Sequence, residues 1–174
     1  MGRRRQHVPL RHRPHLRLQD ANEGRRYPYA EGVVFLAPVA VHLLLVRDGK
    51  ILMLRRFNTG YQDGNYSVVA GHIDGGEELK TAMIREAREE AGITISFSDL
   101  SVAGVIHFRE KEEYVHFFLH ASKYTGDVVN MEPDKCDDLT WFDLDDLPPN
   151  TIPYVRRAIQ NYRNGVWFDS LGWR

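Results

Sequence analysis

The sequence predicts an α/β fold in which a mixed sheet lies between two helices. Three observations lead to it: apolar, β-rich runs bounded by Gly, Asn and Asp turns, one amphipathic helical stripe, and a second helical segment that begins with Pro. This order of elements favours helix–sheet–helix layering. The chain has 174 residues, of which 43% are hydrophobic, and this suits one compact domain with short extensions.

The first 30 residues differ from the rest because arginine dominates them. We predict a basic, flexible arm over residues 1–30 and a single domain over residues 31–174. A solvated tail and a nucleic-acid contact are the two interpretations of the arm, and the tail is favoured because no aromatic residues interleave with the first arginines. The segment lacks the apolar core of a secretory signal, and Pro9 and Pro14 interrupt the helix of a transit peptide. Its eight arginines are Arg3, Arg4, Arg5, Arg11, Arg13, Arg17, Arg25 and Arg26.

The first predicted elements of the domain are strands. Residues 39–46 and 51–56 are apolar and flank the turn Arg47-Asp48-Gly49-Lys50, which indicates a hairpin. A loop rich in Asn, Asp and Gly covers residues 57–65, and residues 66–69 form a short strand.

A helix is predicted over residues 79–91. Leu79, Met83, Ala87 and Ala91 recur every four residues as one apolar stripe, and Gly92 follows as a C-terminal stop. Strands are predicted over 100–108, 114–121 and 139–144, and a closing helix over 153–162. We expect the aromatic residues 166–173 to pack back on the domain, with a dimer contact as the alternative.

The central helix carries an unusual group of carboxylates. Glu86, Glu89 and Glu90 stand at positions i, i+3 and i+4, so they share one face. Adjacent carboxylates repel each other unless a cation neutralises them, and Mg²⁺ or Mn²⁺ suits oxygen ligands. Taken alone, the same pattern is also typical of a solvated surface helix.

The complete string GHIDGGEELKTAMIREAREEAGI resembles the Nudix box, G-x5-E-x7-R-E-U-x-E-E-x-G-U, where U is a bulky apolar residue. Gly71 opens it, Glu77 follows after five residues, and Arg85 begins the run that ends at Ile93. Every fixed position matches, although Ala87 is smaller than the usual apolar residue. The resemblance in element order extends roughly over residues 38–162.

This resemblance implies an α/β/α sandwich with a mixed sheet and metal-dependent hydrolysis of a diphosphate linkage. It implies metal ligation by three carboxylates and one glycine carbonyl, proton transfer by box carboxylates, and an ion pair that locks the loop to the helix. The implied metal ligands are Gly71, Glu86, Glu89 and Glu90, the catalytic carboxylates include Glu89 and Glu90, and the ion pair is Glu77 with Arg85.

A later loop carries a further expected catalytic residue. Several family members place a general base before the last short strand, and Glu132 lies at about that place. Other carboxylates compete for the role; they are Glu110, Glu112, Glu113, Asp134 and Asp137.

Four residues are candidates for contact with the substrate. Arg55 or Arg56 is expected to hold a phosphate, and strand alternation allows at most one of them to reach the site. Tyr61 is expected to stack on a base, and Asn150 occupies the region where MutT-type members place a base-reading Asn.

The favoured substrate is a nucleoside triphosphate, cut to monophosphate and pyrophosphate. The markers of members that cleave ADP-ribose, dinucleoside polyphosphates, NADH or CoA are absent or misplaced. The alternatives are nonetheless ADP-ribose, a dinucleoside polyphosphate, capped RNA, or a Nudix domain that only binds a nucleotide or RNA. An isomerase on the same fold would need a catalytic Cys, and Cys136 lies too late in the chain.

The cellular setting follows from cysteine and hydropathy. Cys136 is the one cysteine, which excludes an internal disulfide and favours a reducing compartment. The longest apolar run, residues 32–46, is too short to span a bilayer. We therefore expect a cytoplasmic monomer or homodimer that contacts no membrane.

Overall fold

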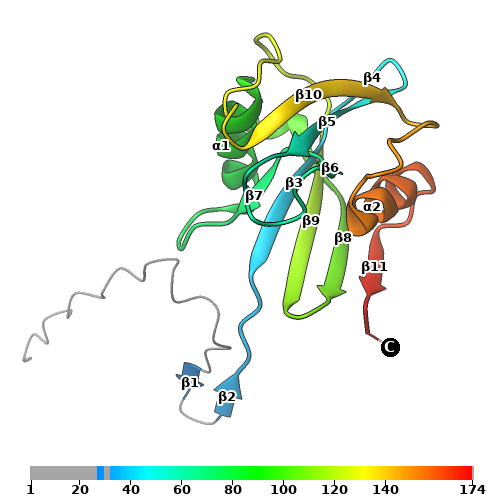
Figure 1. Ribbon diagram of the computed structural model, residues 1–174. Helices are drawn as coiled ribbons and strands as arrows, with labels where there is room; N and C mark the ends of the chain where they lie inside the picture. Colours follow the sequence, from blue (N-terminus) through cyan, green and yellow to red (C-terminus); the bar gives the residue numbers. More distant parts are fainter. Residues whose placement is uncertain (1–26, 30–31, 174) are drawn as a thin grey trace, which may run out of the picture. The chain divides into compact units, whose positions relative to one another are not determined.

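The computed structural model describes residues 27–29 and 32–173 (Figure 1). It groups residues 1–36 and 37–174 into two compact units. The described part of the first unit is an antiparallel pair, β1 (Tyr27–Tyr29) and β2 (Gly32–Val34). Most of the predicted arm, residues 1–26, lies outside the described residues, so the division at residue 30 stays a prediction.

A five-stranded mixed sheet forms the centre of the second unit. Its strand order is β11-β8-β9-β3-β7, with β3 parallel to β9 and β11 parallel to β8, and the other pairs antiparallel. This sheet confirms the predicted α/β class. The strands are β3 (Val39–Leu44), β7 (Ala70–His72), β8 (Leu100–Arg109), β9 (Glu113–Ala121) and β11 (Phe168–Leu171).

A second sheet lies over the ends of the first and contains β4 (Val46–Arg47), β5 (Lys50–Arg56), β6 (Tyr66–Ser67) and β10 (Cys136–Asp143). The predicted strand 39–46 is therefore divided. The Leu43 amide donates to the Val69 carbonyl (2.8 Å), whereas the Leu45 carbonyl accepts from the Leu52 amide (3.0 Å). The chain leaves one sheet and enters the other at Leu45. The predicted strand 66–69 is shorter in the structure, where β6 ends at residue 67 and β7 begins at residue 70.

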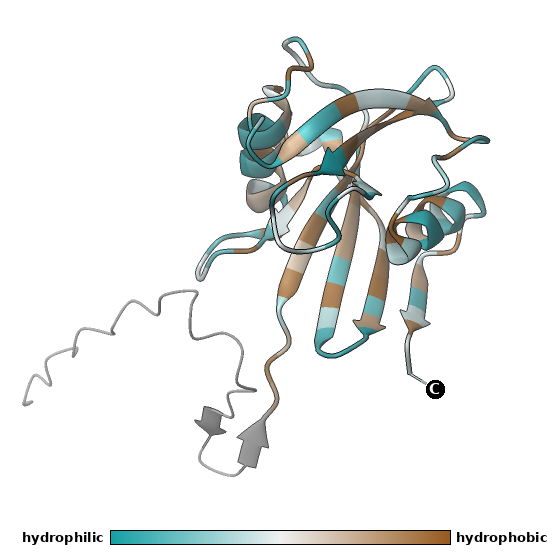
Figure 2. Cartoon of the chain, viewed as in Figure 1, coloured by the Kyte–Doolittle hydropathy of each residue, from teal (hydrophilic) through white to brown (hydrophobic). Residues whose placement is uncertain are grey.

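Two helices cover opposite faces of the five-stranded sheet. Side chains alternate along a strand, so Val41 and Leu43 pack with α1 (Leu79–Ala91), while Leu44 packs with α2 (Pro153–Arg163). Figure 1 shows the strands between these helices, and Figure 2 shows the apolar stretches along β3 and β9. The layers are those expected from the order of elements.

The last residues form an element that the sequence analysis did not predict. Residues 168–171 pair with β8 in parallel as strand β11, at the edge of the sheet. A short 3-10 helix, Phe97–Asp99, precedes β8. Among the described residues, no helix is both long and apolar enough to cross a membrane.

Candidate active site

Local sequence fixes where helix α1 begins and ends. Glu78 caps its start by accepting hydrogen bonds from the amides of Lys80 (2.8 Å) and Thr81 (3.0 Å). Gly92 ends it with φ 70°, a left-handed conformation that favours glycine. Four apolar residues of the helix are buried, which directs the glutamates to the other side; they are Ala82 and the stripe residues Met83, Ala87 and Ala91.

Arg85 ties the preceding loop to this helix. Its Nε and Nη2 donate to both oxygens of Glu77 (2.9 and 3.0 Å), and Nη2 also donates to the His72 carbonyl (3.1 Å). Its Nη1 donates to Glu86 (2.5 Å) and Glu89 (3.2 Å). The guanidinium lowers the pKa of Glu77, and Glu77 in turn raises the pKa of Arg85. The Arg85 guanidinium therefore holds three carboxylates and the loop backbone together.

Two of the glutamates converge on the edge strand β7. A side-chain carbon added to Gly71 would lie 1.9 Å from Glu86 Oε1, so the Glu86 carboxylate fills the space that a larger residue would need. The Ala70 amide donates to Glu90 Oε2 (3.0 Å). Glu86 and Glu90 thus meet the backbone at consecutive residues.

The crowding of these carboxylates shifts their proton equilibria. Burial raises the pKa of Glu90 to about 8, the Ala70 hydrogen bond opposes this, and the charges of Glu86 and Glu132 add to it. Burial also raises the pKa of Glu86. Buried carboxylates with raised pKa values are typical of functional sites.

The donor set suits a hard divalent cation. Carboxylate oxygens and the Gly71 carbonyl are the ligands that Mg²⁺ and Mn²⁺ prefer. The described residues contain no group of three or more His, Cys, Asp or Glu side chains already gathered around one point. Glu89 instead faces Arg85 and is half exposed.

The loop that carries Glu132 is anchored to the end of α1. The amides of Val129 and Met131 donate to the carbonyls of Ala91 (3.0 Å) and Glu90 (3.1 Å). The Glu132 carboxylate accepts from Lys135 Nζ (2.8 Å) and raises the pKa of both Glu86 and Glu90. Its position beside the box carboxylates is compatible with the expected role as a base.

The competing acids have other neighbours. Asp137 is paired with Arg55, Glu113 with His107 (2.9 Å), and Glu112 accepts from the Tyr114 hydroxyl (3.2 Å). Burial raises the pKa of Tyr61, and the charge of Glu110 adds to this effect. Asp134 is exposed.

The two arginines at the end of β5 point to different partners, as alternation requires. Arg55 donates to both oxygens of Asp137 (2.7 and 3.1 Å). Arg56 donates to the Tyr61 carbonyl (2.7 Å) and to Thr59 Oγ1 (3.1 Å), and its charge partly offsets the raised pKa of Glu90. Arg56 is therefore the arginine on the side of the box.

Tyr61 lies in loop 57–65 beside Arg56, and Asn150 lies in the segment before α2. The Arg56 guanidinium lies 5.4 Å from the centre of the Tyr61 ring, which is 45% exposed. Asn150 Nδ2 donates to the Gly64 carbonyl (2.7 Å), so its amide fastens loop 57–65 to the segment before α2. The structure places Tyr61 where it is accessible, and it gives Asn150 a structural hydrogen bond.

Sequence analysis missed Lys135, which holds Glu132. The signal was available, because Lys135 follows Glu132 by three residues in a turn closed by the Lys135 amide and the Glu132 carbonyl (2.9 Å).

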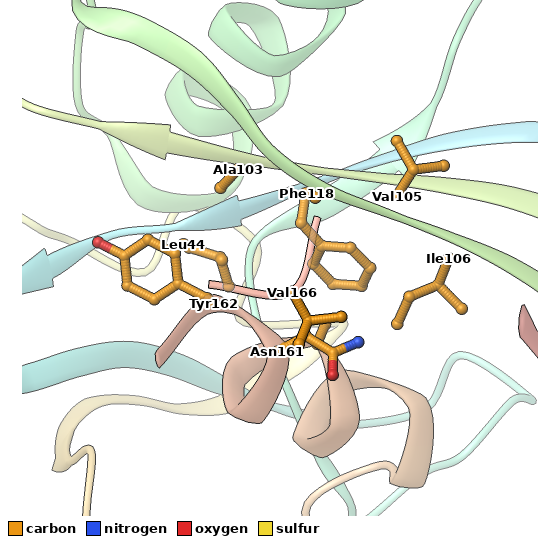
Figure 3. Close-up of a pocket in the computed structure, with 10 residues that line it drawn as sticks. Leu44, Ala103, Val105, Ile106, Phe118, Asn161, Tyr162 and Val166 are labelled. Atoms are coloured by element: carbon orange, nitrogen blue, oxygen red, sulfur yellow. The ribbon is translucent and has the colours of Figure 1, made fainter. Parts of the chain in front are cut away.

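A separate small pocket lies between α2 and the sheet, lined by Leu44, Phe118 and Asn161 among others (Figure 3). None of the predicted site residues lines it.

Comparison with known protein families agrees with this geometry. The family model described as the NUDIX domain matches residues 36–162, which include every predicted site residue. The chain belongs to the Nudix family. Residues 71–93 are its Nudix box.

Curated relatives and solved structures extend this finding. The chain is 32% identical over 107 residues to a protein named NAD-capped RNA hydrolase NudC from Pseudomonas aeruginosa, covering 62% of this chain and 36% of that protein. A protein of the same name from Chromobacterium violaceum is 30% identical over 142 residues, with 79% and 51% covered. The chain thus spans about half or less of these relatives. The structure of a MutT Nudix hydrolase from Burkholderia pseudomallei matches with 29% identity and a TM-score of 0.67, covering 72% and 97%.

Proposed function

We propose that this Nudix protein hydrolyses a diphosphate linkage in a nucleotide with the help of Mg²⁺ or Mn²⁺. One observation carries the proposal: Glu86 and Glu90 converge on the backbone of residues 70–71 while Arg85 fixes the loop around them. Close, partly buried carboxylates of this kind are costly in an apo protein, and a divalent cation offsets the cost.

The metal would be held by the box. Its proposed ligands are Glu86, Glu89, Glu90 and the carbonyl of Gly71. When bound, the metal neutralises charge on the phosphate oxygens and acidifies a water molecule.

The remaining steps belong to the chain's own residues. Arg56 would hold a phosphate oxygen near the box, because its charge acts on Glu90 and its guanidinium is positioned by Tyr61 and Thr59. Glu132 would accept the proton of the attacking water, with Lys135 fixing its carboxylate. Glu89 and Glu90 are the alternative acceptors within the box.

A nucleoside triphosphate, cut to monophosphate and pyrophosphate, is the leading substrate. The likeness to the MutT Nudix hydrolase structure supports this choice. We further propose a cytoplasmic location, on the ground that the single cysteine is free and buried.

NAD-capped RNA is the second candidate, because the relatives from Pseudomonas and Chromobacterium carry that activity in their names. The arginines of the first 30 residues would suit an RNA backbone. Against this candidate, the chain lacks the long motif of NADH-cleaving members and spans about half or less of these relatives.

A substrate panel tests both candidates. Purified protein is incubated with nucleoside triphosphates, ADP-ribose, dinucleoside polyphosphates, NADH and NAD-capped RNA, with Mg²⁺, with Mn²⁺ or with EDTA. We expect metal-dependent release of a monophosphate product that EDTA abolishes, and the best substrate separates the candidates. Absence of release from the whole panel with either metal would refute the proposed function.

A further inference from the structure

Lys135 belongs to the turn that carries Glu132, and its backbone is fixed on two sides. The Glu132 carbonyl accepts from the amides of Lys135 (2.9 Å) and Cys136 (2.9 Å). The Asn130 side chain ties the same turn together, because it accepts from the Glu132 amide (3.1 Å) and donates to the Cys136 carbonyl (2.6 Å). The Lys135 carbonyl accepts from the amide of Phe57 (2.8 Å), which directly follows β5. The start of the lysine side chain is therefore held between the turn and the end of β5.

The Lys135 side chain pairs with the carboxylate of its own turn. Its Nζ lies 2.8 Å from Glu132 Oε1, and the side chains of Lys135 and Glu132 are 62% and 30% exposed. Ion pairs in which one partner is this exposed contribute little to the stability of the fold. The main consequence of the pair is therefore electrostatic, because it keeps a full positive charge beside Glu132.

The charge of Lys135 acts on the Nudix box as well as on its partner. The hydrogen bond to Glu132 raises the pKa of Lys135, burial opposes this, and the charges of Glu132, Glu90 and Glu86 add to it. Electrostatic attraction is mutual, so the ammonium stabilises the charged forms of the same three carboxylates. Two of them, Glu86 and Glu90, are proposed metal ligands.

Two internal cations therefore neutralise part of the charge that a divalent cation would neutralise. Arg85 donates to Glu86 (2.5 Å) and Glu89 (3.2 Å), and it is also bound to the loop backbone. Lys135 serves Glu132 through one hydrogen bond from an exposed side chain. Lys135 is thus the less constrained of the two cations.

We infer that Lys135 is an internal counter-ion of the Nudix carboxylates, which compensates Glu132 in the metal-free protein and lowers the affinity of the site for a free divalent cation. A cation that approaches Glu86 and Glu90 is repelled by the lysine charge that these carboxylates already attract. Phosphate groups are negative, so a cation that arrives with the phosphates of the substrate meets less repulsion. The inference rests on the proposed function, because it takes Glu86 and Glu90 as metal ligands.

Binding of Mn²⁺ alone tests the inference. Electron paramagnetic resonance of free Mn²⁺ measures its dissociation constant for the full chain at fixed pH and ionic strength. We expect Lys135→Met, which removes the charge and keeps most of the aliphatic chain, to bind Mn²⁺ about 3- to 10-fold more tightly than the wild type. Turnover at saturating Mn²⁺ should fall in the same variant, because Glu132 loses the group that orients it. A residue with only a structural role would not change these two quantities in opposite directions.

Lys135→Arg and Lys50→Met are the matched controls. Lys135→Arg keeps a positive charge and should bind Mn²⁺ like the wild type. Lys50 lies at the opposite end of β5 from Arg56, about 20 Å along the strand, so Lys50→Met removes a lysine charge far from the box. This variant should also bind Mn²⁺ like the wild type, and melting temperatures verify that all variants fold.

Unchanged or weaker Mn²⁺ binding by Lys135→Met, or equally tightened binding by Lys50→Met, would overturn the inference. The proposed function is judged separately, by metal-dependent release from the panel.

Discussion

At the scale of single residues, Gly71 shows how closely the site is packed. The Glu86 carboxylate lies where a Gly71 side chain would be, 1.9 Å from the added carbon. Because a glutamate end is flexible, Gly71→Ala should displace the Glu86 carboxylate rather than unfold the protein. We expect metal-dependent turnover to fall about 100-fold or more, with a melting temperature close to that of the wild type.

Gly75→Ala provides the control for this substitution. Gly75 lies in the same loop, has no positive φ, and an added carbon would meet nothing within 4 Å. Its turnover should stay near the wild-type value. Equal loss in both variants would show that loop flexibility, rather than the position of Glu86, matters.

Glu90→Gln should separate stability from activity. The pKa of Glu90 is raised from 4.5 to about 8 when the metal-free chain folds, so the folded state binds more protons between these values. Its contribution to stability is present below about pH 4.5 and is lost as the pH rises through about 8. At pH 9 without metal, the variant should therefore melt above the wild type, while turnover with Mg²⁺ falls by orders of magnitude. A lower melting temperature in calorimetry at that pH would contradict this account.

Sequence spacing located the box residues because their geometry is local. Glu86, Glu89 and Glu90 share a face of any α-helix. Arg56 and Asn150 could not be assigned in this way, since their partners, Tyr61 and Gly64, are set by how loop 57–65 folds. Spacing along one helix therefore predicts which side chains lie together, whereas contacts between separate segments depend on the tertiary fold.

At the scale of elements, Arg85 joins the loop to helix α1. Arg85→Ala would leave Glu77, Glu86, Glu89 and the His72 carbonyl without their shared donor. We expect a loss of about 1–3 kcal/mol of unfolding free energy, together with reduced turnover. Urea unfolding measures the first effect. Arg88→Ala, an exposed change on the same helix, should stay close to the wild type, and an equally small effect of Arg85→Ala would refute the locking role.

Elements with local signals were predicted more accurately than those that depend on pairing. Helix α1 has the predicted bounds, Leu79–Ala91, because its stripe and its terminal Gly92 are both readable in sequence. The change of sheet at Leu45 has no local signal, since apolar residues continue through it. Strand β11 forms by pairing with β8. The sequence predicts strand β8 but does not show which segment lies beside it.

At the scale of the whole molecule, every proposed site residue lies in residues 37–174. We therefore expect a protein truncated to residues 37–174 to turn over small nucleotides at the rate of the full chain. Steady-state assays of both proteins on the best nucleotide check this. If NAD-capped RNA is the substrate, the truncated protein should lose RNA affinity, because eight arginines are removed. Loss of small-nucleotide turnover would show that the first unit contributes to the site.

The layered fold was predictable as a whole, because strands with apolar side chains on both faces require a helix on each side of the sheet. The apolar stripes of the two helices supply those partners. The sheet order was not predictable, because β3 pairs in parallel with β9 and lies next to β7, which comes from a different part of the chain. This order brings His42 of β3 against His116 of β9.

Two tyrosine–histidine stacks join β9 to α2, one between His116 and Tyr154 and the other between His120 and Tyr162. The distance between the two histidines along the strand must therefore match the distance between the two tyrosines along the helix. His116 and His120 are four residues apart, about 13 Å along a strand, and Tyr154 and Tyr162 are eight apart, about 12 Å along a helix. An inserted or deleted residue in either element would put one stack out of phase with the other. Length changes between these anchors are therefore expected to be excluded.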